Sequence, residues 1–245
     1  MQEKPTDLEL RTTQDHFGFG LPDPIEKDWY VVQAMQVLLA LGTAPFQLVF
    51  GGGTCLARAH RLVQRMSEDV DFKVVLRERH AAPGSGNQLR RALGQLRDQV
   101  AAALQAPGFA LAQVTAGNDN QYIAYQLSYD GAWGANLQLR PTLQIELHYS
   151  ALRQPPVERP VGSLVAEAFG RPAEISGTLC VNVAETAAEK LVALTRRTAM
   201  ALAGNHRAAD QTLVRHIYDL HMVRDQLDPG LVATMAREIA QADAE

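Results

Sequence analysis

The sequence predicts an α+β fold, in which a mixed sheet flanked by helices is followed by a mainly helical C-terminal part. Residues 46–75 form the pattern strand, glycine turn, helix, second strand. Residues 109–149 hold further runs typical of strands, and the chain beyond residue 182 shows apolar spacing typical of helices. With 245 residues, 47% of them hydrophobic, the chain is long enough to bury a substantial core.

Composition narrows the classes of function. The net charge is −4, from 23 lysines and arginines against 27 aspartates and glutamates, so any nucleic-acid contact must be a local patch. Cys55 and Cys180 lack metal-ligand spacing, which predicts a reducing compartment and small core residues. The polar N-terminus and the absence of an 18-residue apolar run predict a cytoplasmic protein without membrane contact.

The N-terminal segment is expected to be irregular up to residue 25. Glycines and prolines punctuate it: Gly18, Gly20, Pro22 and Pro24. Asp28 is a plausible N-cap for a helix over residues 29–41 that ends at Gly42. We expect this helix to lead into the first strand.

A glycine triplet follows the apolar run over residues 46–50. Gly51, Gly52 and Gly53 carry no Cβ and so allow a bulky anion such as a phosphate to approach the backbone. Thr54 then opens a helix whose free N–H groups point toward that anion. The run lacks both the Walker and the dinucleotide-binding spacings, and a plain tight turn is the alternative.

Two aspartates begin the next strand. Asp69 and Asp71 are two residues apart, so in a strand they share one face, as a divalent-metal site requires. Ser67, just before them, is placed to hydrogen-bond a phosphate oxygen. A solvated loop or a helix cap is the alternative for an isolated Asp-x-Asp, but a glycine turn followed by paired carboxylates is the minimal set for phosphoryl or nucleotidyl transfer.

Basic side chains gather in two places. The helix between the two motifs is expected to carry Arg58, His60, Arg61 and Arg65, which either meet a triphosphate or nucleic-acid backbone or form a solvated face. A long helix over residues 88–104 carries Arg90, Arg91 and Arg97.

Three strands are expected over residues 109–114, 121–127 and 137–149, with a hairpin turn at Asp130-Gly131. In the last strand, Gln144, Glu146 and His148 share one face. Glu146 suits a third metal carboxylate by residue type and strand context, although an exposed strand glutamate is the alternative. His148 is more typical of a structural polar contact.

The proline-rich stretch over residues 153–160 is expected to lack regular structure and to be a hinge. It divides the chain into residues 1–152 and 153–245. A short strand over 178–183 then precedes a helix to Ala203, with Asn182 and Glu185 as a capping box. Lys190 borders a partly apolar stripe of that helix.

A last helix over residues 207–224 carries Asp219. Burying this aspartate unpaired is costly, which suggests a partner such as Lys190 or a substrate group. Solvated positions are the alternative for both residues.

These motifs resemble the AbiEii/AbiGii nucleotidyltransferase toxin family. The stretch GGGTCLARAHRLVQRMSEDVDFKVV is similar to its pattern G-G/S-T, helix, S-x-D-x-D, and ETAAEKLVALTRR and RHIYDL are similar to its later Lys and Asp motifs. Over residues 45–225 the resemblance implies a polymerase-beta-like nucleotidyltransferase fold that uses Mg²⁺ (or Mn²⁺) and a nucleoside triphosphate. It also implies the toxin of a toxin–antitoxin pair with a cognate antitoxin protein, and some members modify the 3′ end of tRNA.

Carried onto this chain, the resemblance makes Lys190 the triphosphate lysine, supported by Arg196 or Arg197, and matches Asp219 directly. His216 stands at a position that is usually acidic in the family. The resemblance also implies that the long basic helix over residues 88–104 lies near the mouth of the site, which makes it the leading candidate for substrate contact. The expected catalytic residues are Asp69, Asp71, Lys190 and Asp219; the substrate-binding residues are Gly52, Gly53, Thr54, Ser67 and Arg197; the metal ligands are Asp69, Asp71 and Glu146.

The expected reaction moves a nucleoside monophosphate from the triphosphate to an acceptor hydroxyl, for which the resemblance points to the tRNA 3′ end. One alternative is an antibiotic-modifying nucleotidyltransferase, which would need a dense acidic acceptor pocket; no such cluster lies outside the motifs. A second alternative is a non-enzymatic module that binds a partner protein. The intact set of acidic and lysine motif residues argues against it.

Overall fold

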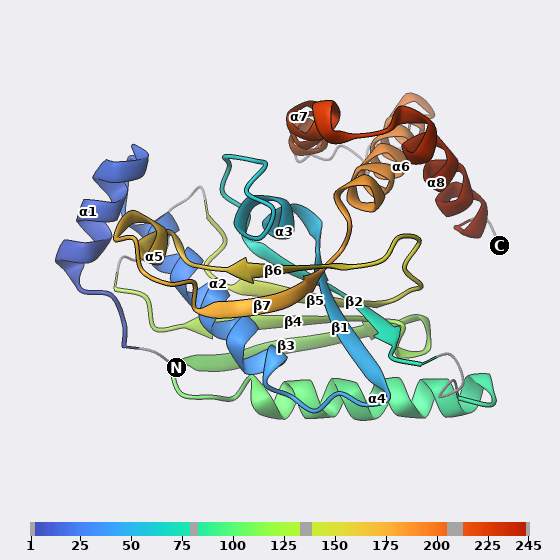
Figure 1. Ribbon diagram of the computed structural model, residues 1–245. Helices are drawn as coiled ribbons and strands as arrows, with labels where there is room; N and C mark the ends of the chain where they lie inside the picture. The colour runs from blue at the N-terminus through green and yellow to red at the C-terminus, as the bar shows by residue number, and fades with distance from the viewer. Residues whose placement is uncertain (1–2, 79–82, 133–138, 205–212, 244–245) are drawn as a thin grey trace.

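The computed structural model describes residues 3–78, 83–132, 139–204 and 213–243. Figure 1 shows a mixed sheet with helices on both sides. The strands are β1 (Phe46–Gly51), β2 (Asp69–Leu76), β3 (Phe109–Gly117), β4 (Tyr122–Tyr129), β5 (Leu143–Tyr149), β6 (Val157–Val161) and β7 (Ile175–Cys180). The α-helices are α1 (Asp7–Phe17), α2 (Asp23–Leu39), α3 (Gly52–Arg58), α4 (Gly86–Ala103), α5 (Leu164–Ala168), α6 (Val183–Leu202), α7 (Leu213–Val223) and α8 (Pro229–Ala242). Among the described residues, Asn118–Asn120 and Arg224–Gln226 form 3₁₀ turns.

The strand order in the sheet is β3-β4-β5-β2-β1-β7-β6. β2 pairs in parallel with β5, and β1 pairs in parallel with β7, while the other neighbours are antiparallel. The two centre strands β1 and β2 are the strands on either side of the glycine turn. The expected strand, turn, helix and strand unit is therefore confirmed and lies in the middle of the sheet.

The two faces of the sheet differ because side chains alternate along a strand. One face is apolar: Phe72 of β2 and Ile145 of β5 are buried in a core with α2 and with Leu93 and Leu96 of α4. The other face carries the polar residues of the same strands and lies toward α3 and α6. In Figure 1, α4 runs below the sheet, whereas α3, α6, α7 and α8 lie above it.

A second apolar cluster joins the C-terminal helices to α3. It contains Leu56 and Ala57 of α3, Ala188 of α6, Val223 at the end of α7 and Met235 of α8. This packing fixes α6 and α7 beside the glycine turn. A smaller cluster of Leu10, Ile25, Leu164 and Val165 holds α1 and α5 against α2.

The expectation of an irregular N-terminal segment is wrong. α1 spans Asp7–Phe17, and Thr6 with Glu9 forms a capping box at its start. α2 begins at Asp23 rather than at residue 29, because Pro24 fits the first turn of a helix. Asp28 is therefore not a cap: it is buried inside α2, where its carboxylate accepts a hydrogen bond from Leu164 N at 2.6 Å.

The proline-rich stretch over residues 153–160 is irregular only up to residue 156. β6 forms from Val157 to Val161 and pairs with β7 at the edge of the sheet. Pro160 is tolerated there because an edge strand has one side without a partner, and the register shifts between Arg159 and Val161. β6 and β7 belong to the same sheet as β1, while the division of the chain after residue 152 stays a prediction.

Other boundaries differ by a few residues. α3 begins at Gly52, not Thr54, and ends at Arg58, so His60, Arg61 and Arg65 follow the helix instead of lying on it. β5 begins at Leu143. Residues 137–138 of the expected strand, and the expected start of the last helix at 207, lie outside the described residues.

The start of α6 is capped by Asn182, whose side chain accepts from Ala184 N. Glu185 does not complete a capping box. It is fully buried and pairs with Lys73 Nζ of β2 at 2.5 Å, and it accepts from Arg153 N and Gln154 N. A buried lysine needs such an acidic partner, which here ties α6 to the sheet.

Cys55 and Cys180 are both buried and free, as the composition suggested. Among the described helices, none combines the length and the apolar character needed to cross a bilayer.

Candidate active site

Three carboxylates lie side by side on the polar face of the sheet. β2 and β5 run parallel in a register that pairs Asp71 with Glu146 and Asp69 with Gln144. Asp69, Asp71 and Glu146 therefore share one face of two hydrogen-bonded strands, as expected from their alternation. We call these three residues the acidic cluster.

The acidic cluster carries more negative charge than its surroundings balance. Burial, followed by the charges of Glu146 and Asp69, raises the pKa of Asp71 to about 7. Burial also raises the pKa of Asp69, although the charge of Arg140 opposes this. The pKa of Glu146 is lowered, chiefly by its hydrogen bond with His148. Like charges held together in this way favour the binding of a proton or a cation.

Gly52 makes room for one of these carboxylates. Its φ is +69°, a left-handed conformation that suits glycine, and a Cβ on it would lie 1.9 Å from Asp71 Oδ2. The need for glycine here is thus explained by Asp71 within the protein itself. The contact of Gly52 with a phosphate stays a prediction.

The next residues connect α3 to the segment before β2. A Cβ on Gly53 would lie 2.5 Å from Arg65 Nη2 and 3.3 Å from Ser67 Oγ, so the arginine and the serine both lie against this glycine. Thr54 is buried, and its hydroxyl donates to Asp69 O. The Thr54 side chain therefore holds α3 on β2, and its own contact with substrate stays a prediction.

A second set of charges surrounds Asp219 of α7. Its fully buried carboxylate accepts from Arg65 Nε at 2.7 Å and Nη2 at 2.6 Å, and from Lys190 Nζ at 2.9 Å. Burial alone would raise the pKa of Asp219, but the hydrogen bond from Arg65 and the charge of Lys190 bring it below its usual value. Two cations on one anion leave a net positive charge beside Gly53. We call Arg65, Lys190 and Asp219 the cationic triad.

The structure thus brings Lys190 and Asp219 together, as the sequence suggested. Lys190 is also close enough to the acidic cluster for its charge to lower the pKa of Asp71. Of the two arginines expected to support Lys190, Arg197 faces α7, with Nη1 3.3 Å from His216 Nε2. Arg196 is more exposed and pairs with Asp243 at 2.8 Å.

His216 occupies a cationic environment. Burial, then the charges of Lys190 and Arg197, lowers its pKa to about 4, so it is neutral at pH 7. A neutral imidazole can accept from the Arg197 guanidinium. This residue therefore packs among cations without adding to their charge.

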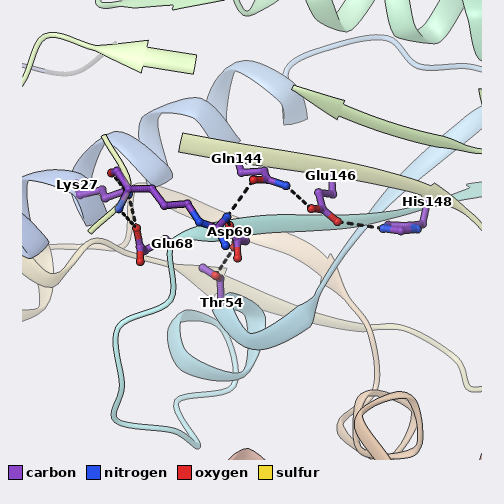
Figure 2. Close-up of polar contacts among 8 residues, drawn as sticks. Lys27, Thr54, Glu68, Asp69, Gln144, Glu146 and His148 are labelled. Carbon is purple, nitrogen blue, oxygen red and sulfur yellow. Dashed lines mark hydrogen bonds and ion pairs between the residues drawn. The ribbon is translucent and has the colours of Figure 1, made fainter. Parts of the chain in front are cut away.

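A polar network at the other end of the site was not expected from the sequence. Arg140 Nη1 donates to Asp69 Oδ1 at 2.7 Å and to Gln144 Oε1 at 2.9 Å, and Gln144 Nε2 donates to Glu146 Oε1 at 2.5 Å. Figure 2 shows these contacts continuing from Glu146 to His148. Gln144 and His148 carried the signal of period-two alternation with Glu146, whereas no local pattern distinguishes Arg140. Arg65 lies in the same R-x-S-x-D-x-D stretch as both aspartates, which could have singled it out.

The expectation that the long basic helix lies near the site mouth is wrong. α4 packs on the apolar face of the sheet through Leu93 and Leu96, and the acidic cluster lies on the opposite face. Arg90 instead pairs with Asp119 at 3.5 Å, and Arg97 donates to Asn120 Oδ1 at 3.2 Å. Strand alternation separates these arginines from the carboxylates.

The chemistry of the acidic cluster fits a divalent metal ion. Its donors are all carboxylate oxygens, the ligands that Mg²⁺ and Mn²⁺ prefer, and their mutual repulsion would be relieved by a cation. No group of three His, Cys, Asp or Glu side chains is arranged as a ready metal cage in the described part of the chain. Asp69 and Glu146 would have to turn from Arg140 and Gln144 to bind a shared ion.

Comparisons with known proteins identify the family and the fold. The family described as nucleotidyl transferase AbiEii toxin, of type IV toxin–antitoxin systems, matches residues 34–245. Among solved structures, the chain is similar to MenT4, a nucleotidyltransferase toxin from Mycobacterium tuberculosis H37Rv, with a TM-score of 0.57 and 20% sequence identity. The similarity covers 93% of this chain and 68% of MenT4. A search of curated protein sequences gave no match.

The structural likeness, at this identity, shows the fold, and the family match extends over most of the chain and includes every residue of the acidic cluster and the cationic triad. The chain belongs to the AbiEii family of nucleotidyltransferase toxins.

Proposed function

We propose that this nucleotidyltransferase toxin moves a nucleoside monophosphate from a nucleoside triphosphate to an acceptor hydroxyl, and that the acceptor is the 3′ end of tRNA. One observation carries the proposal. An acidic cluster with excess negative charge lies next to a cationic triad with excess positive charge, and Gly52 and Gly53 lie between them. A nucleoside triphosphate needs positive charges beside its phosphates. Its reacting α-phosphorus also needs a nearby group that takes up the proton of the attacking acceptor hydroxyl.

The cationic triad is suited to hold the triphosphate. Asp219 orients Lys190 and Arg65, and it neutralises only one of their two charges. Both cations therefore retain attraction for phosphate oxygens, which grows as negative charge builds on the leaving pyrophosphate. Ser67 and Gly53, which lie against Arg65, would line the same path. Arg197, further along α6, would extend it.

The acidic cluster is suited to a metal ion and to the acceptor hydroxyl. Asp69, Asp71 and Glu146 would hold Mg²⁺ or Mn²⁺, which when bound supplies positive charge to the phosphates. A carboxylate of the cluster orients the acceptor hydroxyl and accepts its proton as the oxygen bonds to the α-phosphorus. The bond from the α-phosphorus to the bridging oxygen breaks, and pyrophosphate leaves toward the cationic triad.

The acceptor and the partner protein are inferred from the family. Because some relatives modify tRNA ends, we assign the same acceptor here, and we assign a cognate antitoxin protein as the partner that controls the enzyme. Both nucleoside triphosphates and tRNA are abundant in the cytoplasm, where the enzyme would act. The acceptor does not meet α4, since that helix covers the other face of the sheet.

The test is to incubate the protein with each α-labelled nucleoside triphosphate, total tRNA and Mg²⁺ or Mn²⁺, and to follow label in RNA. We expect label on tRNA from at least one triphosphate, and none with EDTA or with Asp71→Asn. Transfer to tRNA lacking a free 3′ hydroxyl should fail. Label that appears only on an added aminoglycoside would support a small-molecule acceptor, and pyrophosphate release without any acceptor would reject transfer.

A further inference from the structure

Arg140 is held by its backbone in an unusual way. Glu68 Oε2 accepts from Arg140 N at 2.9 Å, and Lys27 Nζ donates to Arg140 O at 2.6 Å. Lys27 and Glu68 also pair with each other at 2.5 Å. Figure 2 shows this ion pair at the end of the site network. The backbone N–H and C=O of Arg140 are thus both bound by one ion pair, formed by Lys27 of α2 and Glu68 of the segment before β2. We call this ion pair the clamp.

The clamp is deeply buried. The Lys27 side chain is fully buried, and burial lowers its pKa despite the nearby Glu68 carboxylate. A buried ion pair adds little net stability, because desolvation offsets much of the attraction, but it holds its partners in one geometry. What this pair fixes, besides itself, is the position of residue 140.

The side chain that starts from this fixed point reaches the acidic cluster. Its guanidinium donates to Asp69 Oδ1 at 2.7 Å, while 48% of the Arg140 side chain and 30% of the Asp69 side chain remain exposed. The contact therefore lies at the rim of the cluster, where the arginine can move into solvent without crossing protein. Its second acceptor, Gln144, lies two residues before Glu146 on β5 and is an uncharged amide.

We propose that Arg140 is a built-in counter-ion of Asp69, which a divalent cation displaces when it enters the acidic cluster. The inference rests on the proposed metal-dependent function. In the state described here, Arg140 is the largest positive charge acting on Asp69, and it opposes the negative charges of Glu146 and Glu68. A metal ion and this guanidinium repel each other when both contact Asp69. The arginine side chain therefore turns away from Asp69 into solvent as the metal binds. The clamp keeps it at the rim, ready to return.

The opposite possibility is that Arg140 stays on Oδ1 and orients Asp69 for the metal. The two possibilities predict opposite changes in metal affinity when Arg140 is removed, because an orienting arginine strengthens metal binding and a counter-ion weakens it. Mn²⁺ binding to the protein without nucleotide, followed by electron paramagnetic resonance, separates them. Arg140→Gln should bind Mn²⁺ at least tenfold more tightly than the wild type. Arg90→Gln, with the same loss of charge on the other face of the sheet, should stay within twofold.

Equal or weaker Mn²⁺ binding by Arg140→Gln, with a wild type that does bind, overturns the inference and leaves the metal site intact. If the wild type, Arg140→Gln and Asp71→Asn all fail to bind Mn²⁺, the metal site itself is rejected and the inference with it. Mn²⁺ binding by Arg140→Gln but not by the wild type supports both the metal site and the displacement of Arg140.

A second measurement does not depend on how well the glutamine variant folds. Arginine side-chain ¹⁵N resonances of the wild type are recorded with and without saturating Mg²⁺, and Arg140 is assigned from Arg140→Lys. The Arg140 signal should move toward that of a free, rapidly exchanging guanidinium as Mg²⁺ binds. An Arg140 signal that is unchanged at saturation contradicts displacement.

Discussion

Asp219 and Asp71 lie on opposite sides of the glycine turn, and the protein treats their charges in opposite ways. Asp219 is fully buried, yet its pKa is lowered because Arg65 and Lys190 contact it directly. Asp71 also loses solvent around its carboxyl group, and this burial, followed by the charges of Glu146 and Asp69, raises its pKa to about 7. The ion pairs around Asp219 are complete within the protein, whereas Asp71 has a deficit of positive charge.

This difference separates a structural role from a binding role. A carboxylate with its cations in place orients them, and removing it leaves buried positive charge without compensation. A carboxylate crowded by other carboxylates lowers the stability of the free protein, and the binding of a cation removes this repulsion and stabilises the fold. The following substitutions test whether the two aspartates differ in this way.

The largest effect is expected for Asp219→Ala. The substitution leaves Lys190 and Arg65 largely buried without their anion, so the free energy of unfolding should fall by about 3–5 kcal/mol. Urea unfolding followed by circular dichroism measures this. The control is Asp225→Ala, whose side chain is 79% exposed and which should change stability by less than about 0.5 kcal/mol. A loss below about 1 kcal/mol for Asp219→Ala would show that the cationic triad is not a structural unit.

Lys190→Ala should act on transfer more than on folding. Asp219 keeps both of its bonds to Arg65, so the fold should persist. Transfer should fall at least 100-fold, about 2.7 kcal/mol of barrier, because one phosphate-facing charge is lost. Initial rates of label transfer give this value. Arg196→Ala, on the same helix but paired with Asp243 and exposed, should stay within threefold of wild type. A Lys190→Ala rate in that same range would remove Lys190 from the site.

Asp71→Asn should leave the metal-free protein as stable as the wild type, or more so by about 1 kcal/mol, equivalent to about 2–4 °C. The pKa of Asp71 is raised in the folded state, so its contribution to stability is full below pH 4 and is lost as pH rises toward 7. In EDTA, the advantage of the variant should therefore grow between pH 5.5 and pH 8. Thermal melts at both pH values measure it.

The same variant should lose the stabilisation that Mg²⁺ with nucleoside triphosphate gives to the wild type. Asp98→Asn, an exposed aspartate on α4, should keep it. If Asp71→Asn melts well below the wild type in EDTA, Asp71 is a structural hydrogen-bonding residue, and the contrast with Asp219 disappears.

The smallest effect is expected on α4. Because Arg90 and Arg91 lie across the sheet from both charged groups, Arg90→Glu combined with Arg91→Glu should change transfer to tRNA by less than about twofold. Steady-state transfer at two salt concentrations measures the effect, since phosphate contacts weaken steeply with salt. A tenfold loss would place the acceptor on α4 after all.

The sequence predicted the centre of the molecule well, since its signals are local. The strand ending at the glycines, the alternation that puts Asp69 with Asp71, and the spacing that turns Lys190 inward all depend on a few consecutive residues. The pairing of Asp219 with Lys190 followed from the cost of burying a lone charge. These predictions are confirmed as geometry, and the catalytic roles of the residues stay predictions.

The errors have identifiable causes. Thr6 and Glu9 form a capping box, and the expectation of an irregular segment rested on the glycines and prolines after it without using that pattern. Pro160 was read as a breaker, although an edge strand accepts proline. Arg140 gave no signal because its role depends on Lys27, which is 113 residues away in sequence. The position of α4 depended on which face of the sheet it covered, and the helix sequence alone does not determine that.

The clamp on Arg140 has a practical consequence for anyone who shortens this protein. The family match begins at residue 34, but Lys27 and Asp28, which hold Arg140 O and Leu164 N, come earlier in the chain. A truncated form that starts at the family boundary would retain every motif residue and still lose these two anchors. It would also leave Glu68 buried without its lysine. We therefore expect a fragment that keeps these anchors to include α2, which begins before the recognisable sequence.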